Sequence, residues 1–265
     1  MKGLNQQRIQ SALADNPFIT EVVYQKQIGS TNDLAKERAA HWAPEGLLVV
    51  ADEQVSGRGR LDRSWWAPPG GALLTSLLFR PSLPSSHASV GQLTMLCALA
   101  AADAVRALTG LQVDLKWPND LMIRSGSTWL KLAGLLAETG FLGERLAFVV
   151  VGLGLNVNMD MSQAPELLTP ATSLMSQLAR PVDRLALLRA YLNNVAERYA
   201  QLGQGISPHG EWASRLVTLN CQVGAQVGDQ KLEGYAEGVG EDGALLLRTP
   251  DGQLHRLQAA DVSLR

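Results

Sequence analysis

Apolar residues recur every three or four positions in several parts of the chain, and this spacing predicts helices. The predicted helices cover 4–14, a segment that starts after Ser30, 86–108, 173–178, 184–202 and about 208–216. A hydroxyl or amide near Ser30 is expected to cap the second helix, and Asp183 to cap the helix at 184–202. Gly110 and Gly203 stand just beyond two of these helices, where glycine favours the left-handed turn that ends a helix.

Short apolar or alternating runs predict strands between these helices. The strands cover 21–27, 47–51 and 72–79, and then 113–116, 121–123, 129–138 and 145–151, which form an antiparallel meander. From about Val217 the pattern changes to five short glycine-rich strands, with turns at Asp242–Gly243 and Asp251–Gly252. The order predicts an α+β fold, with one domain over 1–216 and a small SH3-like barrel over 217–265.

Composition and charge narrow the possible partners. The 265 residues are 46% apolar and 18% charged, and 23 basic against 25 acidic residues give a net charge of −2. This balance argues against binding to nucleic acid or membrane by bulk charge, so any anion must be met by a local cluster. The N-terminus lacks an apolar signal core and no apolar run has the length of a membrane helix. Cys97 and Cys221 lie in apolar surroundings and are expected to be buried free thiols, which fits a cytoplasmic protein.

The segment 54–70 is predicted to be a loop, and it holds a candidate anion-binding motif. Ser56–Arg63 contains three arginines, Arg58, Arg60 and Arg63. Gly57 precedes the first of them, and Gly59 lies between the first two. Arginine pairs with phosphate and carboxylate oxygens through two hydrogen bonds, and glycine lets the backbone approach a ligand. A solvated basic turn or a nucleic-acid tether explains the same residues, and both alternatives stay open at this point.

Two strand regions carry polar residues where apolar ones are expected. Lys116–Asp120 places a lysine, a tryptophan, a proline, an amide and a carboxylate at a strand end; a turn with Trp117 in the core explains it equally well. Lys131 opens the apolar strand 131–138, and strict alternation places it on the face of Ala133 and Leu135. There it either reaches solvent or pairs with an anion, and Gly134 marks a close approach of backbone or ligand.

Two further patterns were considered for cofactors and metals. Gly152–Asn158 (GLGLNVN) forms a tight polar strand exit, but a third glycine and a following helix are missing, so a dinucleotide-binding fold is excluded. The four histidines, at 41, 87, 209 and 255, are scattered without ligand spacing. The sequence therefore predicts no metal site built from side chains.

Taken together, six segments resemble the biotin protein ligase family, the biotin–[acetyl-CoA-carboxylase] ligases. They are Gly29–Asn32, Glu53–Gln54 with Gly57–Arg60, Trp65, Lys116–Asp120, Lys131–Leu136 and Gly152–Asn156. The resemblance runs from about residue 21 to the C-terminus, and it implies a mixed sheet with helices on one face, followed by the SH3-like barrel. Many family members add an N-terminal DNA-binding domain, and too few residues precede position 21 to form one. Ligase activity without DNA binding is therefore expected.

The resemblance also implies a reaction with ATP and biotin as substrates and Mg²⁺ on the phosphates. Biotin is activated as biotinyl-5′-AMP and transferred to a lysine of the biotin carboxyl carrier protein of acetyl-CoA carboxylase. The expected catalytic residues are Lys131, Arg60 and Arg58. Biotin is expected to bind Ser30, Thr31, Asn32, Gln54, Arg58, Gly59, Arg60, Lys131 and Gly134. ATP is expected to bind Gly57, Arg58, Arg60, Trp65, Lys116, Asn119, Asp120 and Asn156, with Trp65 stacked on the adenine.

Two alternatives remain beside this interpretation. A lipoate or octanoate protein ligase shares the implied fold and chemistry. A nucleic-acid-binding module would use the arginine-rich loop, although the tail 217–265 holds more acidic than basic residues. No membrane partner is expected, and the sequence leaves a homodimer open.

Overall fold

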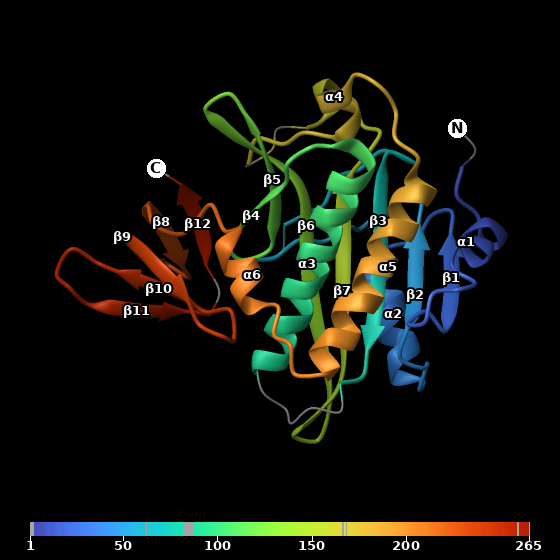
Figure 1. Cartoon of the computed structure of the whole chain (residues 1–265), viewed down its shortest axis with the longest axis horizontal. Coiled ribbons are helices and arrows are strands. Elements are labelled where there is room, and N and C mark those ends of the chain that lie inside the picture. The colour runs from blue at the N-terminus through green and yellow to red at the C-terminus, as the bar shows by residue number, and fades with distance from the viewer. Residues whose placement is uncertain are drawn as a thin grey trace.

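In the computed structural model of the protein, the described residues are 3–61, 63–81, 87–165, 167, 169–258 and 260–264. Asp62 in the predicted loop and Ser86 at a predicted helix start therefore lie outside the described residues. Within them the strands form a seven-stranded sheet and a five-stranded sheet, which lie beside each other (Figure 1). The α+β prediction is confirmed.

The larger sheet has the strand order β1-β2-β3-β7-β6-β5-β4. Its strands are β1 (Glu21–Gln25), β2 (Leu47–Ala51), β3 (Ala72–Phe79), β4 (Asp114–Lys116), β5 (Asp120–Ser125), β6 (Thr128–Leu142) and β7 (Arg145–Asn156). Only β1 and β2 pair in parallel, and the other neighbours are antiparallel, so the sheet is mixed. The predicted meander is β4 to β7, and β6 and β7 extend further than the sequence predicts.

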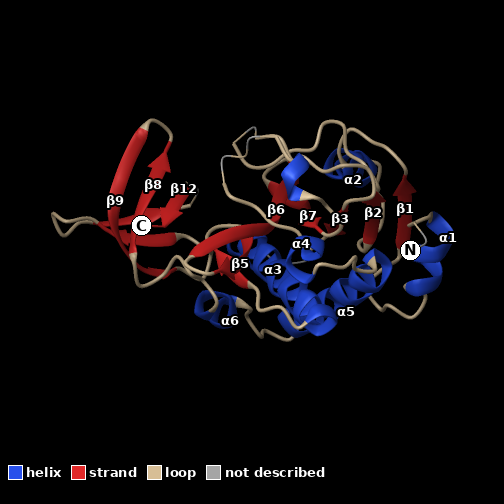
Figure 2. Ribbon diagram, turned by 90° about the horizontal axis from the view of Figure 1, so that it is seen from above, coloured by secondary structure: helices blue, strands red, loops and turns tan. Residues whose placement is uncertain are grey.

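The helices cover both faces of this sheet, not one. They are α1 (Gln6–Ala12), α2 (Thr31–Ala40), α3 (His87–Thr109), α4 (Leu174–Leu178), α5 (Arg184–Gly203) and α6 (His209–Ser214), with a 3₁₀ turn at Met161–Gln163. Figure 2 shows α3, α5 and α6 on one side of the sheet and α2 on the other. On β2, Leu48 and Val50 join the main core, whereas Leu47 and Val49 pack with Ala35 of α2. The prediction of helices on one face therefore holds for α3, α5 and α6 but not for α2.

Two predicted helix ends differ from the structure. Ser30 occupies the N-cap position of α2, but its side chain makes no capping hydrogen bond. Gln54 from the following loop supplies it instead, because its Oε1 accepts from the Thr31 N–H at 2.7 Å. Gly203 is the last residue of α5, and Gly205 two residues later adopts the left-handed φ of +83°. Gly110, at φ +75°, ends α3 as predicted.

The smaller sheet follows the large one in the chain and is joined to it through Trp117. It consists of β8 (Gln222–Val227), β9 (Gln230–Val239), β10 (Leu245–Arg248), β11 (Leu254–Leu257) and β12 (Asp261–Leu264), all paired antiparallel. Trp117 is 1% exposed, and its indole Nε1–H donates to the Gly243 carbonyl at 2.8 Å. The SH3-like prediction fits this sheet, and the boundary between 216 and 217 stays a prediction.

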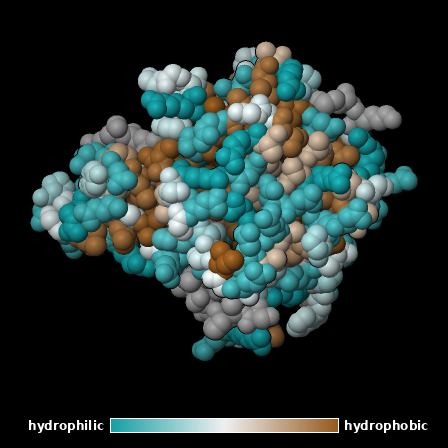
Figure 3. All heavy atoms as spheres, in the orientation of Figure 1, coloured by the Kyte–Doolittle hydropathy of each residue, from teal (hydrophilic) through white to brown (hydrophobic). Residues whose placement is uncertain are grey.

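Within the described residues, Val90–Thr109 of α3 is the one stretch whose length and apolar character would allow it to cross a membrane. It packs against α5 and the sheet as a core helix, and most of it is buried. Around it the surface seen in Figure 3 is largely hydrophilic, with apolar side chains scattered among polar ones. The two cysteines form no disulfide; Cys97 is buried as predicted, whereas Cys221 is only half-buried.

Candidate active site

A single large cavity of about 1260 Å³ brings the predicted site residues together. It lies where β2 and β7 end and where α2, β3 and β6 begin, and strands of the small sheet close one side. The predicted residues that line it are Ser30, Thr31, Asn32, Gln54, Arg58, Gly59, Arg60, Trp65, Lys116, Asn119, Asp120, Lys131, Gly134 and Asn156. Gly57 lies behind the lining, where a Cβ would come within 2.8 Å of the Trp65 carbonyl oxygen.

One end of the cavity is a pocket of neutral polar groups at the start of α2. Gln54 Oε1 accepts from both the backbone N–H and the hydroxyl of Thr31, at 2.7 and 2.9 Å. Ser30 and Thr31 are buried, and Ser76 from β3 lies 2.8 Å from the Thr31 hydroxyl. Gln54 bonds through its oxygen, and among the described residues no hydrogen bond from its amide nitrogen is seen, which leaves that nitrogen as a donor for a ligand. Such a set suits an uncharged polar group better than an ion.

Bare backbone from two adjacent strands forms the floor of the cavity. Gly134 on β6 pairs with Gly154 on β7, and Gly152 lies two residues further along the same face. A Cβ on Gly152 would lie 2.3 Å from Asn32 Oδ1, and a Cβ on Gly154 would lie 2.6 Å from the Trp65 ring. Side chains at these positions would therefore fill the site. Of these three glycines, only Gly134 was predicted from the sequence to lie in the site. The alternation of Gly152 and Gly154 after an apolar strand could have indicated that they share one face of the sheet.

Trp65 lies inside the cavity with its ring against this floor. The Lys131 ammonium lies 5.6 Å from the centre of the ring, within range of a cation–π contact. The indole Nε1 is buried and has no hydrogen-bond partner among the described residues. An aromatic plane and a free donor therefore face the ligand space, and the stacking of Trp65 on adenine stays a prediction.

The other end of the cavity gathers cations around one carboxylate. Lys131 Nζ lies 2.7 Å from Asp120 Oδ1, and Arg60 and Lys116 lie close enough to interact with the same carboxylate. Burial lowers the pKa of Arg60 and of Lys116, and neighbouring cations lower them further, while Asp120 acts in the opposite direction. Three buried or half-buried cations against one anion leave a positive excess, which a bound anion would neutralise.

Lys131 faces the cavity because β6 contains a bulge. Leu121 on β5 pairs with Ala133, but the next residue, Met122, pairs with Lys131, so Leu132 is an extra residue. Leu132 and Ala133 are both fully buried, whereas the Lys131 side chain lies beside Gly134. The predicted face shared with Ala133 and Leu135 is therefore wrong, because strict alternation assumes a regular strand.

Arg58 is held away from these cations. Its guanidinium pairs with Asp33 of α2 and lies 3.4 Å from Glu138 Oε2 on β6. The hydrogen bond to Asp33 raises the pKa of Arg58, and burial counteracts this only in part. The structure thus places Arg58 on the rim. The sequence did not predict that Asp33 and Glu138 contact Arg58, because neither residue lies in a segment that carries the family resemblance.

Three predicted asparagines use their side chains to hold the cavity walls. Asn119 Nδ2 donates to the Leu135 carbonyl at 2.6 Å, and Asn156 Nδ2 donates to the Thr172 carbonyl at 3.0 Å. Asn32 Nδ2 bonds to the Leu136 carbonyl and to Glu138. Asn32 therefore uses both amide hydrogens within the protein, and Asn119 and Asn156 use one each.

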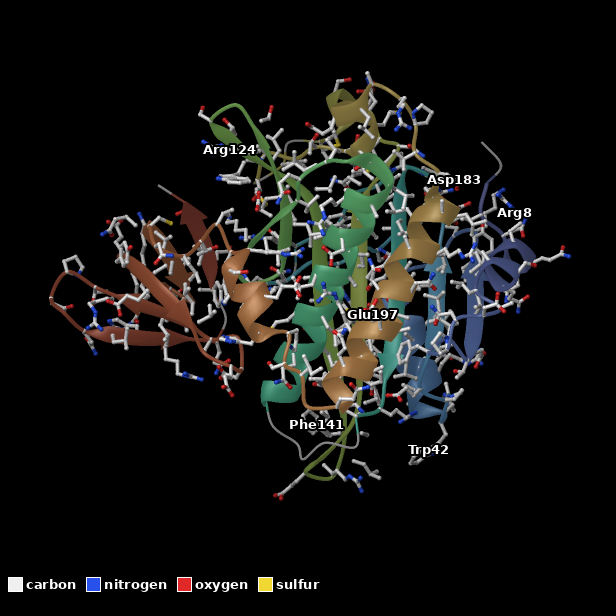
Figure 4. The ribbon with its side chains drawn as sticks, viewed as in Figure 1. Arg8, Trp42, Arg124, Phe141, Asp183 and Glu197 are labelled. Carbon is white, nitrogen blue, oxygen red and sulfur yellow. The ribbon has the colours of Figure 1, made fainter. Side chains whose placement is uncertain are left out.

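The small sheet contributes a wall that the sequence analysis did not assign. Arg63 of the loop forms an ion pair with Asp261 of β12, and Lys231 of β9 also lines the cavity. Arg124, near the tip of the β5–β6 hairpin, lies at the top of the view in Figure 4, whereas Trp42 and Phe141 lie at the bottom. Across the described residues, no grouping of three His, Cys, Asp or Glu side chains could hold a metal ion.

Known proteins share this arrangement. The sequence profile of the Biotin/lipoate A/B protein ligase family matches residues 24–156, and that of the Biotin protein ligase C terminal domain matches residues 218–265. A "Bifunctional ligase/repressor BirA" of Bacillus spizizenii is 34% identical over 264 residues, which cover 98% of this chain and 79% of that protein. The chain belongs to the biotin protein ligase family.

Other biotin protein ligases match over most of their length. A "Biotin--[acetyl-CoA-carboxylase] ligase" of Mycobacterium tuberculosis is 34% identical over 245 residues, 89% of this chain and 86% of that protein. The biotin protein ligase of Aquifex aeolicus, solved with biotin and ATP, superposes with a TM-score of 0.75 at 28% identity, covering 93% and 99% of the two chains. The biotin names and the C-terminal match favour a biotin ligase over a lipoate ligase.

Proposed function

We propose that this biotin protein ligase joins biotin to AMP from ATP and passes the biotinyl group to a lysine of a biotin carboxyl carrier protein. The observation that carries the proposal is one cavity with two different ends. A neutral hydrogen-bonding pocket at α2 suits a ureido ring, and a cation cluster at Lys131 suits a carboxylate and a phosphate. The glycine floor between them leaves room for an apolar chain.

In the proposed binding mode, Ser30, Thr31 and Gln54 hydrogen-bond the ureido group. The biotin rings would lie along Gly134, Gly152 and Gly154, which carry no side chains of their own. The Trp65 ring, which lies against Gly134 and Gly154, would move off this floor when biotin binds. Asn32 contacts this floor but keeps its donors on the protein, so it orders the pocket. Gly57 and Gly59 let the loop backbone come close to the ligands.

The first step brings two anions together, and the cations offset their repulsion. A biotin carboxylate oxygen forms a bond to the α-phosphorus of ATP as the bond to the β-phosphate oxygen breaks, and pyrophosphate leaves. Two unit charges 4 Å apart repel by about 4 kcal/mol at an effective dielectric near 20. Lys131 and Arg60 would lie between carboxylate and α-phosphate, and Lys116 would stabilise the leaving pyrophosphate. Arg58 would order the loop, since its charge is already paired.

In the second step the carrier lysine attacks the acyl carbon of biotinyl-AMP. The new C–N bond replaces the C–O bond to phosphate, AMP leaves, and the amine loses its proton. Asp120, the carboxylate next to Lys131, is our candidate to orient the amine. The loop that carries Arg60 and Trp65 would exclude water from the anhydride.

Mg²⁺ is proposed to enter with the nucleotide. Asp120 already pairs with Lys131, and the described residues offer no cage of carboxylates. With so few protein oxygens on offer, the ligands of the ion would be mainly phosphate oxygens and water. Such an ion would neutralise part of the phosphate charge. We further propose a cytoplasmic enzyme that acts on a carrier protein and binds neither DNA nor membrane.

Titration calorimetry tests this proposal directly. Biotin is expected to bind the protein, a non-hydrolysable ATP analogue is expected to bind the biotin complex, and lipoate is expected to give no heat. Binding of lipoate but not biotin would contradict the assignment of the neutral pocket.

The floor offers a steric test. Changing Gly152 to alanine places a methyl group 2.3 Å from Asn32 Oδ1, which is buried and hydrogen-bonded, so it cannot move aside freely. We expect the KM of biotin to rise by about tenfold or more, since overpacking costs roughly 1–3 kcal/mol. Gly210→Ala in α6, where the glycine is exposed and an added Cβ meets nothing within 4 Å, is the surface control. Unchanged biotin binding in the Gly152 variant would contradict the floor.

The lowered pKa of Lys116 predicts a pH dependence. Lysine attracts phosphate only while protonated, so affinity for ATP should fall as pH rises through its pKa. Because burial lowers this pKa, the fall should begin at a lower pH than an ordinary lysine would produce. The Lys116→Met variant should bind ATP more weakly, and its affinity for ATP should no longer fall over this pH range. Identical profiles for both proteins, measured by fluorescence titration, would exclude Lys116 from the phosphate site.

A further inference from the structure

We propose that Glu138 is a positioning residue that couples the biotin pocket to the arginine loop. The inference rests on the proposed function, because that function assigns biotin to the pocket at α2 and phosphate to the arginine loop, which Glu138 joins. Glu138 lies on β6, beyond the stretch paired with β5, and its side chain is 24% exposed. It ends the predicted strand 131–138 and lies outside the Lys131–Leu136 segment that carries the family resemblance.

The contacts of the Glu138 carboxylate come from two separate elements. Oε2 accepts from Asn32 Nδ2 at 2.7 Å, and Oε1 accepts from Lys36 Nζ at 2.5 Å, both on α2. Arg58 Nη2 of the loop lies 3.4 Å and 3.5 Å from the two oxygens. One carboxylate therefore ties the first turns of α2 and the arginine loop to the sheet.

On the pocket side, Glu138 fixes Asn32. Both hydrogens of Asn32 Nδ2 are used, one by Glu138 and one by the Leu136 carbonyl at 3.2 Å, and its Oδ1 accepts from Ser76 at 2.6 Å. The same side chain lies against Gly152. Asn32 directly follows Ser30 and Thr31, so its position sets where their hydroxyls stand. Loss of the Glu138 contact removes one of the three hydrogen bonds that hold the Asn32 side chain.

On the loop side, Arg58 anchors a short hairpin. Arg58 forms a β-bridge with Ser64, and the Gly59 N–H donates to the Arg63 carbonyl at 2.7 Å. Arg60, our phosphate ligand, lies within this hairpin. Holding the Arg58 side chain therefore restricts where Arg60 can point.

The charges of the cluster balance. Asp33 and Glu138 face Lys36 and Arg58. Burial alone would raise the pKa of Asp33, but hydrogen bonds from Arg58 and Lys36 outweigh it and hold that pKa below its usual value. A neutral residue at 138 would leave one excess positive charge and only Asp33 to hold Arg58. Both the α2 turn and the loop should then loosen together.

The test compares Glu138→Gln with Glu21→Gln in the full chain. Glu21 also pairs with an α2 cation, Arg38, but lies far from the cavity, so its variant controls for a lost carboxylate and ion pair. In biotin-dependent ATP–pyrophosphate exchange, the KM of biotin in Glu138→Gln should rise about tenfold. Its kcat at saturating biotin should stay close to wild type, and Glu21→Gln should match wild type in both.

Trypsin cleavage supplies a second readout, which reports how firmly the arginine loop is held and is interpreted together with the KM of biotin. Cleavage after Arg58, Arg60 and Arg63 should be faster in Glu138→Gln, and protection by biotin should require more biotin. A KM equal to that of Glu21→Gln, or faster cleavage without a change in KM, would overturn the coupling. Wild-type protein without biotin-dependent exchange would instead refute the proposed function, which the same assay reveals before any variant is measured.

Discussion

Replacing Lys131 with alanine should reduce biotin-dependent pyrophosphate exchange by roughly 10³-fold or more, the loss expected when a cation that stabilises a transferring phosphoryl group is removed. Lys131 enters the cavity through the β6 bulge, and its ammonium lies between Asp120 and the Trp65 ring. A carboxylate and an α-phosphate must approach each other at this point. Without the ammonium, Asp120 would add a third negative charge to the site.

The measurement needs a control that separates chemistry from folding. Lys26→Ala, an exposed lysine beyond β1, should retain wild-type exchange. Lys131→Ala should still bind biotin at the neutral pocket, since that pocket lies at the other end of the cavity. Exchange at wild-type rate in the Lys131 variant would remove this residue from the first step.

Replacing Arg60 with alanine should release biotinyl-AMP roughly 10²-fold faster, because truncating one partner of a buried charge pair costs about 2–5 kcal/mol. Arg60 is largely buried, and within the described part of the chain Asp120 is the anion that acts on it, so a phosphate would be a fitting second partner. The complex is formed from biotin and ATP, and the off-rate is followed by dilution into unlabelled biotin and ATP.

Arg145→Ala provides the matched arginine variant, because Arg145 is exposed at the start of β7, away from the cavity. It should release the adenylate at the wild-type rate. Equal off-rates for the Arg60 variant and wild type would show that the loop holds the adenylate through other groups.

The sequence predicted most of the fold because local patterns determine it. Periodicity located the helices and the meander, and Gly110 marked a helix end correctly. Two features of the fold were not predicted, because they depend on residues that are far away in the chain. Gln54 caps α2 from a loop, and α2 covers the second face of β2, where Leu47 and Val49 are buried. Neither fact is visible in the spacing of apolar residues.

The site was predicted unevenly for the same reason. Predicted site residues that lie within sequence motifs, such as Lys131 and Gly134, line the cavity. The face of Lys131 was wrong because a bulge adds one residue to β6, and spacing alone cannot show a bulge. Glu138 lies 106 positions from Asn32 and 80 from Arg58, so only the folded sheet brings the three together. Arg58 was assigned to catalysis from its motif, and the structure shows its charge already paired.

Activation of biotin with ATP in this one cavity can be measured in a single competition experiment. The protein is incubated with ATP, Mg²⁺ and equal amounts of biotin and lipoate, and the bound product is identified by mass spectrometry. We expect biotinyl-5′-AMP together with one equivalent of pyrophosphate. Lipoyl-AMP as the product, or cleavage of ATP to ADP without an adenylate, would contradict it.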